Sequence, residues 1–523
     1  MEKNRNMKLR PLLSLCVCYC AMLSDVGHGA EPLDIGSRRE LFVDDHLIDR
    51  LSGGARLQLH RPAETNDVFV HDTPWEGNRT LYYTIFQDGD IYRMYYRGSQ
   101  IDLPKGGYSI PYNVTCYAES EDGIHWTRPN LGLVEFRGSK KNNIILSGEM
   151  CHAFTPFKDA NPDCPDQHRY KAIVPIYKPV RGLHVYSSPD GIRWKPMTDK
   201  AVITRGYFDS QNLAFWDAAR GCYVDFHRGL RGGPKSLAPP DHESSTKDVM
   251  TATSRDFLQW TEPEWLTYSA ERWTRFSRKE TPVSPFIQFY TNQIQQYHRA
   301  PHIYLGFPTR YVAGRGKLTE LNDRLAKHVE YFGNDYTDGG FMASRDGRHF
   351  KYWDEAFVRP GPQQKDRWVY GDNFQALGIT ETRSAIDGAP NELSVYVSEN
   401  FWRQCRLRRY TLRLDGFVSV HASLSGGEIL TTPFTMGGNT LALNMATSAA
   451  GSMQVEVQTV EGKPIVGFSL ADCPEIFGDS VNCEVTWRDG TELSKLIGKP
   501  IRLRFVLKDA DLYSFQFTSK AKP

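Results

Sequence analysis

The sequence has no excess of charge of either sign. Its 63 Lys and Arg residues are matched by 62 Asp and Glu residues, which leaves a formal net charge of +1. A nucleic-acid-binding surface depends on a basic excess that neutralises phosphates, and an acidic tail would appear as a run of like charges. We therefore expect no nucleic-acid partner.

Long hydrophobic runs are absent after residue 30, where no apolar segment reaches the ~20 residues that a membrane-spanning helix needs. We expect no membrane span. The apolar run at residues 12–23 follows four basic residues and precedes small residues that end at Ala30. This order is typical of a secretory signal peptide. We expect residues 1–30 to be a signal peptide and the mature protein to be secreted or periplasmic.

Cysteine is scarce. Three of the ten cysteines lie before residue 30, and the other seven are an odd number, so at least one has no partner within the chain. Cys151 with Cys164, and Cys473 with Cys483, are close enough in sequence to pair, and their spacing does not match a zinc site. Export permits disulfides without requiring them, so the sequence allows one or two disulfides or none.

A short sequence motif recurs along the chain and predicts the architecture. Four copies read Ser-x-Asp with an aromatic residue four positions after the Asp, and a degenerate fifth copy reads Leu-Asp-Gly-Phe-Val. The steps between successive aspartates are 68, 66, 90 and 69 residues, and the residues are Asp122, Asp190, Asp256, Asp346 and Asp415. A period of this size fits a four-stranded propeller blade. The chain is therefore predicted to be all-β, with a five-bladed β-propeller.

The repeats fade after Asp415 into short alternating segments punctuated by glycine, which favours a separate C-terminal β-sandwich. We expect the propeller over residues 31–418 and the sandwich domain over residues 419–523. Residues 39–72 lead into the ring and are a candidate for its closing strand. Residues 317–331 are the best candidate for a helix.

The repeated aspartates are expected to be structural. An active site needs one copy of a catalytic group, whereas an Asp in a turn accepts backbone N–H bonds and holds the turn. The aromatic residue that follows each Asp can pack between blades.

The candidate catalytic residues precede the innermost strand of a blade, where five repeats would surround one central cavity. Glycoside hydrolysis needs two carboxyl groups, an acid and a base or nucleophile, and a third can hold the acid protonated. We assign Glu76 as the acid, Asp209 as the base or nucleophile and Asp372 as the modulator, with Asp72 and Glu399 in reserve. An acidic residue at such a position can instead cap a loop or pair with Arg.

Amides, arginines and aromatic rings at the same positions suit a polyhydroxylated ligand, because they hydrogen-bond hydroxyls and stack on sugar faces. The expected substrate-binding residues are Asp72, Trp75, Asn78, Arg97, His152, Gln211, Asn212, Arg228, Asn292, Gln293, Arg310, Asn373 and Glu399. His152 has no second His at ligand spacing, so we expect no metal ligands and no cofactor. An axial calcium ion is compatible with a propeller, although no oxygen-rich loop requires one.

The Ser-x-Asp-x-x-x-Trp turns and the acids before the innermost strands resemble the five-bladed propeller glycosidases of glycoside hydrolase families 32 and 43. The stretches Glu40–Asp45 and Asp72–Gly77 also resemble secreted planctomycete-type proteins labelled as family 32-like. The resemblance implies an exported glycoside hydrolase acting on a polysaccharide or oligosaccharide. Where family 32 has Asn-Asp-Pro-Asn, Arg-Asp-Pro and Glu-Cys, this chain offers Trp75–Asn78, Phe208–Ser210 and Glu280–Pro282. Fructan specificity is therefore not carried over.

Two other functions fit the same residues. A glycoside phosphorylase would hold phosphate with Arg97, Arg228 and Arg310. A carbohydrate-binding propeller without catalysis would bind the same sugars and cleave none.

Overall fold

The computed structural model describes residues 31–105, 107–231, 246–269, 288–365, 367–488, 490 and 492–519. The expected signal peptide, residues 1–30, lies outside this range. Within it, no helix combines the length and the apolar character needed to cross a bilayer.

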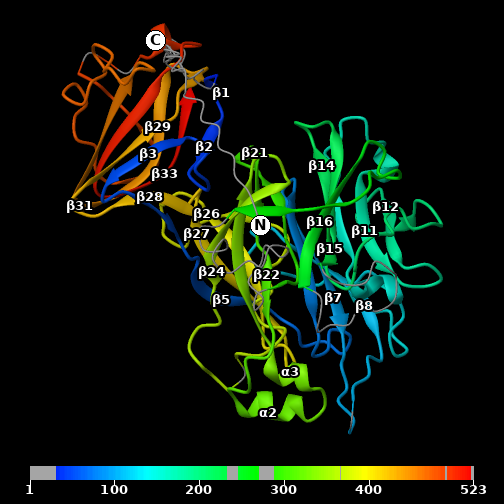
Figure 1. Ribbon diagram of the computed structural model, residues 1–523. Coiled ribbons are helices and arrows are strands. Elements are labelled where there is room, and N and C mark those ends of the chain that lie inside the picture. The colour runs from blue at the N-terminus through cyan, green and yellow to red at the C-terminus, as the bar shows by residue number, and fades with distance from the viewer. Residues whose placement is uncertain are drawn as a thin grey trace, which may run out of the picture.

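Five β-sheets form a ring, and the predicted all-β propeller is confirmed (Figure 1). Tyr-rich and β-branched strands alternate with tight turns, as the pleated, half-buried surface of a blade favours. Blade one contains β6 (Leu81–Asp88), β7 (Ile91–Ser99), β8 (Asn113–Ser120) and β9 (Ile144–Ser147). Blade two contains β10 (Thr155–Lys158), β11 (Tyr170–Ile176), β12 (Gly182–Ser188) and β13 (Lys195–Pro196). Blade three contains β14 (Leu213–Asp217), β15 (Cys222–Arg231), β16 (Thr246–Ser254) and β17 (Glu264–Trp265).

Blade four is the largest and accounts for the step of 90 residues. Its meander is β20 (Gln295–Tyr297), β21 (Ala300–Gly306), β23 (Tyr336–Ser344) and β24 (His349–Val358), joined by β18 (Thr267–Ser269), β19 (Gln288–Phe289) and β22 (Thr309–Val312). The helices α2 (Glu320–Ala326) and α3 (Glu330–Asn334) lie between β22 and β23, where a helix was expected. They lie at the end of the propeller remote from the C-terminal unit (Figure 1).

Blade five is closed by the N-terminal part of the chain. Its strands β25 (Thr380–Thr382), β26 (Glu392–Glu399) and β27 (Arg406–Arg413) are completed by β5 (Ala63–Val70). The closing strand runs antiparallel to β27, with Phe69 opposite Leu407. The expectation of a closing strand within residues 39–72 is confirmed.

A second unit contains strands from both ends of the chain. Strands β28 (Val418–Ala422), β29 (Gly427–Thr431), β30 (Phe434–Met436), β31 (Thr440–Gln458), β32 (Asp479–Glu484) and β33 (Arg502–Thr518) pair with β1 (Leu33–Gly36), β2 (Arg39–Leu41), β3 (Ile48–Gly53) and β4 (Arg56–Leu59). The unit encloses its own core, which includes Leu443, Val455 and Phe505. The sequence division placed residues 31–59 with the propeller, whereas strand pairing joins them to the sheet beyond residue 418.

The repeated aspartates hold turns, as predicted. In the first copy, Oδ1 of Asp122 accepts the backbone N–H groups of Ile124 at 2.8 Å and His125 at 2.7 Å. Asp190, Asp256 and Asp346 make the equivalent bonds. The turn also joins neighbouring blades, because the Tyr396 hydroxyl donates to the carbonyl of Gly123 at 2.7 Å.

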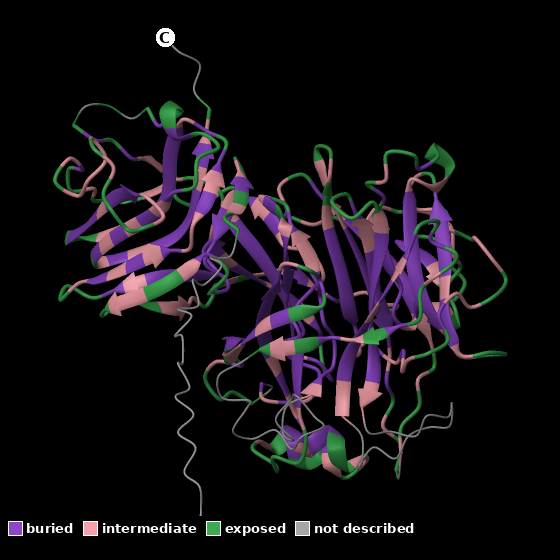
Figure 2. Ribbon diagram, turned by 45° about the horizontal axis from the view of Figure 1, so that its top comes forward, coloured by how far each residue is buried: buried purple, intermediate pink, exposed green. Residues whose placement is uncertain are grey.

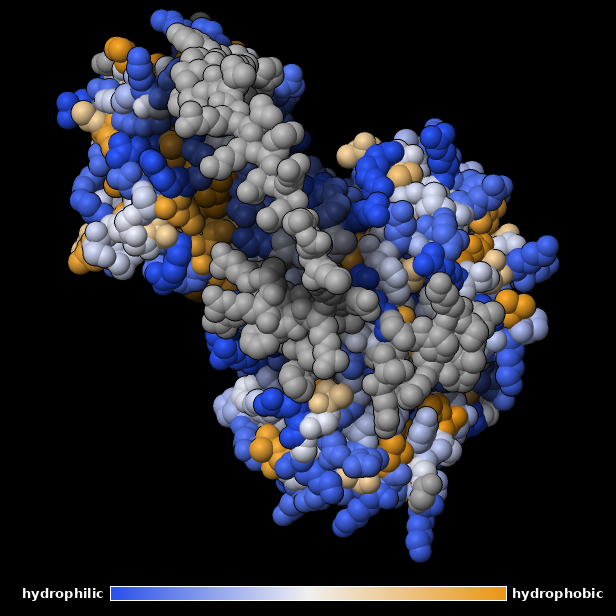
Figure 3. All heavy atoms as spheres, in the orientation of Figure 1, coloured by the Kyte–Doolittle hydropathy of each residue, from blue (hydrophilic) through white to orange (hydrophobic). Residues whose placement is uncertain are grey.

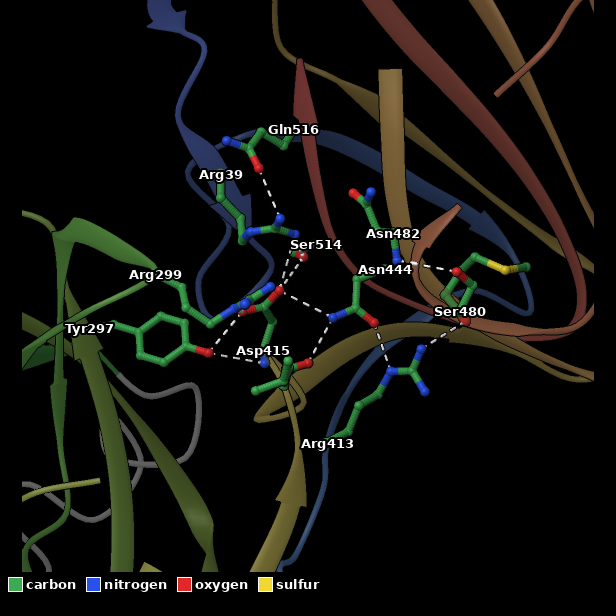
Figure 4. A network of polar contacts seen from close by, with 12 residues as sticks. Arg39, Tyr297, Arg299, Arg413, Asp415, Asn444, Ser480, Asn482, Ser514 and Gln516 are labelled. Carbon is green, nitrogen blue, oxygen red and sulfur yellow. Dashed lines mark hydrogen bonds and ion pairs between the residues drawn. The ribbon is translucent and has the colours of Figure 1, made fainter. Parts of the chain in front are cut away.

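The degenerate fifth copy of the motif, which contains Asp415, has a different role at the junction of the two units (Figure 4). The Asp415 carboxylate is fully buried and accepts hydrogen bonds from both units. Its donors are Tyr297 and Arg299, each at 2.8 Å, Ser514 at 2.9 Å, Asn444 at 3.1 Å and Arg39 at 3.2 Å. Burial alone would raise the pKa of Asp415, but Arg39 and Arg299 outweigh it and lower the pKa.

Burial follows the inner strands of the blades, which are purple in Figure 2. On the face shown in Figure 3, hydrophilic residues dominate the coloured surface and apolar residues occur in small groups. All seven described cysteines are free thiols, so neither of the two disulfides that the spacing allowed is formed.

Candidate active site

A layer of buried glutamines closes the propeller axis. The Gln293 amide donates to Oε1 of Gln211 at 2.7 Å and to the carbonyl of Gln375 at 2.8 Å. The Gln211 amide donates to the Thr84 hydroxyl at 2.9 Å. Four blades are tied together by these bonds, and we name this layer the glutamine plug. It separates a pocket at the α3 end of the axis from an open funnel of about 480 Å³ at the other end.

The pocket at the α3 end is a small cavity of about 110 Å³, which we name the axial pocket. Most of its wall is aromatic: Tyr82, Tyr108, Tyr290, Tyr331, Phe332, Tyr370, Phe401 and Trp402. Its charged lining residues are Arg79, Arg97 and Asp209. Asp209 is the one carboxylate among the described residues of the lining.

Helix α3 roofs the axial pocket with Tyr331 and Phe332. The Phe332 ring contacts Tyr108 at 5.4 Å and Trp402 at 4.4 Å between ring centroids. This roof belongs to the insertion in blade four and to the long β7–β8 loop of blade one. The pocket is therefore built from segments that differ between the repeats.

Asp209 precedes β14, as the sequence predicted, and faces the axial pocket with 42% of its side chain exposed. One oxygen lies 3.1 Å from Nε2 of His152 and the other lies 3.1 Å from Nη2 of Arg228. Enclosure alone would raise the pKa of Asp209, but the adjacent His152 and the charge of Arg228 outweigh it. They hold the pKa well below its usual range, so this carboxyl is ionised at neutral pH.

His152 ends a 3-10 turn, Glu149–His152, and packs its ring edge-on to Tyr82 at 5.9 Å. Burial lowers the pKa of His152 to about 4, although Asp209 acts in the opposite direction. The imidazole is therefore neutral at pH 7, and its Nε2 lies 3.1 Å from Asp209 without an acceptor in hydrogen-bond geometry among the described residues. His152 therefore contacts the carboxylate of the pocket, although it is not one of the described lining residues.

Glu76 does not line the axial pocket. Its fully buried carboxylate accepts hydrogen bonds from Tyr96 at 2.7 Å and from Arg128 at 2.9 and 3.1 Å, and lies 3.3 Å from His71. Burial would raise its pKa, but His71 and Arg128 outweigh burial and lower it. A general acid needs a raised pKa, so the geometry gives no support to the acid role assigned to Glu76.

Asp372 lies behind the pocket wall, next to Gly371, and is 2% exposed. Its Oδ1 accepts the backbone N–H of Phe401 at 2.9 Å, and its carbonyl accepts the Thr337 hydroxyl at 2.6 Å. These bonds fix the wall between Gly371 and Phe401. The structure thus brings Asp209 to the pocket, puts Asp372 behind it and leaves Glu76 elsewhere.

Most of the other expected binding residues are held by protein groups away from the pocket lining. Arg310 pairs with Asp338, Glu399 with Arg367 and Arg408, Trp75 with Asn143, and Asn78 with Ile101. Asn212, Asn292 and Asn373 donate to backbone carbonyls, and Gln211 and Gln293 belong to the glutamine plug. Asp72 is 62% exposed and lies 3.6 Å from Arg128. Of that set, Arg97 lines the pocket, and His152 and Arg228 contact Asp209.

Sequence reasoning missed Arg79 and most of the aromatic wall. Tyr290 lies two positions before Asn292, and Tyr370 lies two positions before Asp372. Their proximity to those residues was an available signal. Three other wall residues lie in insertions that the other repeats lack, so the repeat pattern could not indicate them: Tyr108, Tyr331 and Phe332.

The described residues contain no group of three or more His, Cys, Asp or Glu side chains that could hold a metal ion. Glu280, the nearest counterpart of the family 32 acid, lies outside the described range.

No protein-family model matches the chain. Two curated relatives from Mycobacterium tuberculosis, "Uncharacterized protein Rv1502" and "Uncharacterized protein MT1551", are each 25% identical over 174 residues, or 32% of this chain. The chain spans about half the length of these relatives, 46% in each case.

Several solved structures are similar in fold. A protein titled "Glycoside hydrolase" matches 68% of this chain and 92% of its own, with a TM-score of 0.41 and 13% identity. A family 43 arabinoxylan arabinofuranohydrolase from Bacillus subtilis matches 85% and 96%, with a TM-score of 0.38 and 12% identity. The family 32 β-fructofuranosidase BmSUC1 from Bombyx mori matches 89% and 95%, with a TM-score of 0.36 and 9% identity. At these identities and TM-scores the matches carry no inference about chemistry, which depends on the site.

Proposed function

We propose that this protein is an exported carbohydrate-active enzyme that hydrolyses a glycosidic bond in the axial pocket. The observation that carries the proposal is the position of Asp209. Its ionised carboxylate faces an aromatic pocket on the propeller axis and is held there by His152 and Arg228. Aromatic walls stack on sugar rings, and a fixed carboxylate is a base or nucleophile at an anomeric carbon.

Asp209 fits the base or nucleophile role. Hydrolysis requires a carboxylate that attacks the anomeric carbon or removes a proton from water, and the lowered pKa of Asp209 keeps it in that form. The leaving oxygen must take its proton from a separate general acid, and no second carboxyl group belongs to the described pocket lining. The hydroxyl of Tyr82 remains protonated because burial raises its pKa. It can therefore donate a hydrogen bond to a sugar oxygen, whereas the Tyr370 hydroxyl already donates to Tyr290 at 2.9 Å.

The closed axial pocket is too small for a sugar ring. A cavity of about 150 Å³ admits benzene, and the axial pocket measures about 110 Å³. Substrate entry therefore requires displacement of the roof formed by Tyr108, Tyr331 and Phe332. Such a roof would exclude water once the sugar is bound.

The test is a screen of the mature protein on a panel of polysaccharides and oligosaccharides, run beside Asp209→Asn. We expect cleavage of at least one glycan and a loss of at least about 100-fold in kcat for the variant. The matched control is Asp90→Asn, the same change at the exposed β6–β7 turn, at the other end of blade one. Equal activity of wild type and Asp209→Asn would remove Asp209 from the mechanism.

A glycoside phosphorylase is the second candidate, favoured by the arginines beside Asp209. Phosphate would then replace water as the attacking group, and turnover would require added phosphate. Of the three arginines assigned to phosphate from the sequence, Arg310 is already paired with Asp338, which leaves Arg97 and Arg228. Binding of a glycan that no condition cleaves would instead indicate a carbohydrate-binding propeller. Cleavage of the leader after Ala30, measured by N-terminal sequencing of exported protein, tests the secreted or periplasmic location.

A further inference from the structure

Positive charge exceeds negative charge around the axial pocket. The pocket lining contains Arg79 and Arg97 but one described carboxylate, Asp209. Arg228 reaches the same carboxylate, and Lys247 of β16 lies over the Tyr311 ring at 4.1 Å and near Tyr290 at 5.9 Å. Asp335 also acts on Lys247, but Asp209 and Asp335 together do not neutralise these four cations.

Arg228 is only partly satisfied by protein groups. Its guanidinium is 2% exposed and stacks over the Tyr290 ring at 4.7 Å. Nε donates to the carbonyl of Tyr207 at 3.1 Å, and Nη2 lies 3.1 Å from Asp209. Neither terminal nitrogen, however, has an acceptor in hydrogen-bond geometry among the described residues. Buried polar groups normally find such partners, so this guanidinium is placed to receive one.

Arg97 shows the same pattern on the wall of blade one. It is 3% exposed and stacks over the Tyr82 ring at 4.6 Å. Its terminal nitrogens donate to the carbonyls of Arg79 at 2.9 Å and His152 at 3.3 Å, while Nε has no acceptor in the described part of the chain. Neutral carbonyls supply no charge, so Arg97 has no ion-pair partner among the residues that the structure describes. The stacking and the carbonyl bonds hold the guanidinium rigidly at the pocket.

The electrostatics of the neighbouring groups agree with this geometry. Burial and the adjacent Arg79 together lower the pKa of Arg97 to about 10. Burial and Arg228 lower the pKa of Lys247 to about 8, against the opposing effect of Asp335 and Asp209. Cations that depress one another's pKa mark a site where an additional negative charge would be stabilised.

We infer that the axial pocket recognises a sugar that carries an oxyanion, a uronate carboxylate or a sulfate ester, placed between Arg97 and Arg228. The inference rests on the proposed function, because it takes the ligand to be a sugar, and it adds the chemical class of that sugar. Arg groups suit such oxyanions because their planar guanidinium forms charge-assisted and often bidentate hydrogen bonds. The aromatic wall stacks on the ring while the arginines hold its charge.

The experiment compares matched pairs of ligands on the full mature protein. Uronic acid oligosaccharides are titrated beside their carboxyl-reduced counterparts, and sulfated oligosaccharides beside their desulfated counterparts. Inorganic phosphate alone forms a third arm. Isothermal titration calorimetry measures affinity, and product analysis measures cleavage. We expect one charged oligosaccharide to bind at least about tenfold more tightly than its neutral counterpart, as a charge-assisted hydrogen bond predicts.

Variants identify the residues responsible. Arg97→Met and Arg228→Met should each remove the preference for the charged ligand, measured in each variant as the ratio of its affinity to that of the neutral counterpart. Arg228→Lys retains the charge but loses the bidentate geometry, so it should reduce this ratio and serves as the second variant if Arg228→Met does not fold. The matched control is Arg193→Met, at a 70% exposed arginine on an Asp turn at the other end of the propeller. It should retain the full preference.

The possible outcomes distinguish the proposed hydrolase function from the inference that the sugar is anionic. Equal affinity for charged and neutral members of every pair, with Asp209-dependent cleavage of the neutral glycan, overturns the inference and supports the proposed function. Tight binding of a charged oligosaccharide that is never cleaved supports the inference and overturns the hydrolase. Cleavage that requires inorganic phosphate assigns the arginines to phosphate and overturns the sugar-borne anion. Binding of no glycan overturns both.

Discussion

The side-chain amide of Gln293 donates to Oε1 of Gln211 at 2.7 Å on the propeller axis, and this bond joins blade four to blade three. The same amide reaches the carbonyl of Gln375 in blade five, so one residue links three blades. A central layer of this kind gives the axial pocket a rigid floor. The roof of the pocket, in contrast, consists of side chains from two insertions.

The glutamine plug should contribute to stability. Gln293→Leu keeps a similar volume but leaves the carbonyl oxygens of Gln211 and Gln375 without their donor. We expect a loss of about 1–3 kcal/mol in the free energy of unfolding, the cost of an unsatisfied buried polar group, measured by urea denaturation. Gln87→Leu, at an exposed position near the opposite mouth of the axis, is the control and should change stability by less than about 0.5 kcal/mol. Equal effects of the two changes would contradict a structural plug.

Glu76 should act on stability more than on chemistry. Glu76→Gln removes the charge that compensates Arg128 in a buried site, and we expect a loss of roughly 3 kcal/mol and a clearly lower thermal midpoint. The exposed Glu121→Gln is the control. The acid role predicted from the sequence would instead lower kcat with the midpoint unchanged, so calorimetry and kinetics on the same sample separate the two roles.

His152 should make stability depend on pH between about 6.5 and 4. Its pKa is about 4 in the folded protein and about 6.5 in the unfolded chain. As the pH falls through this window the unfolded chain takes up the proton first, so stability decreases, by up to about 3 kcal/mol, and then levels off. His152→Gln should flatten this part of the profile of thermal midpoint against pH. His125→Gln, at an 86% exposed histidine, should leave the profile unchanged.

Asp415 should couple the two units of the chain. Asp415→Asn leaves Arg39 and Arg299 without their shared counter-charge, and we expect a loss of about 3–5 kcal/mol, seen as separate unfolding transitions in calorimetry. Because the pKa of Asp415 is lowered in the folded protein, its contribution is present above pH ~4 and decreases as the pH falls below that value. Asp479→Asn, at a 68% exposed partner of Arg413, is the control. One unchanged cooperative transition in Asp415→Asn would contradict this coupling.

The ring could be predicted from the sequence because its signal is repeated. Four Ser-x-Asp turns at blade-sized steps report a local hydrogen-bonding geometry that each blade needs, and the turns at Asp122 and Asp190 have the expected bonds. The fifth copy keeps the spacing but not the hydrogen bonds of the turn, because the Asp415 carboxylate accepts hydrogen bonds from both units instead. The pairing of β1–β4 with β33 and its neighbours left no such periodic signal.

The site was harder to predict because side-chain direction depends on backbone conformation. Tyr82, Gln293 and Asn373 have φ values of +61°, +45° and +64°, a left-handed conformation that redirects the neighbouring side chains at the inner strand starts. The prediction assumed that every polar residue before an innermost strand points into the central cavity. This assumption places Asp209 correctly. It misplaces Glu76, whose carboxylate is bound by Arg128, a residue 52 positions away.

The closure of blade five has a consequence for how the chain is made. The closing strand β5 is synthesised early, yet Arg408 of β27 donates to the carbonyl of Thr65, 343 residues before it. A nascent chain that ends before β27 therefore carries an orphan edge of unpaired backbone groups, which is an aggregation hazard. The ring can close only after nearly the whole propeller has emerged from the ribosome, so truncation before residue 406 should yield insoluble product rather than a four-bladed ring.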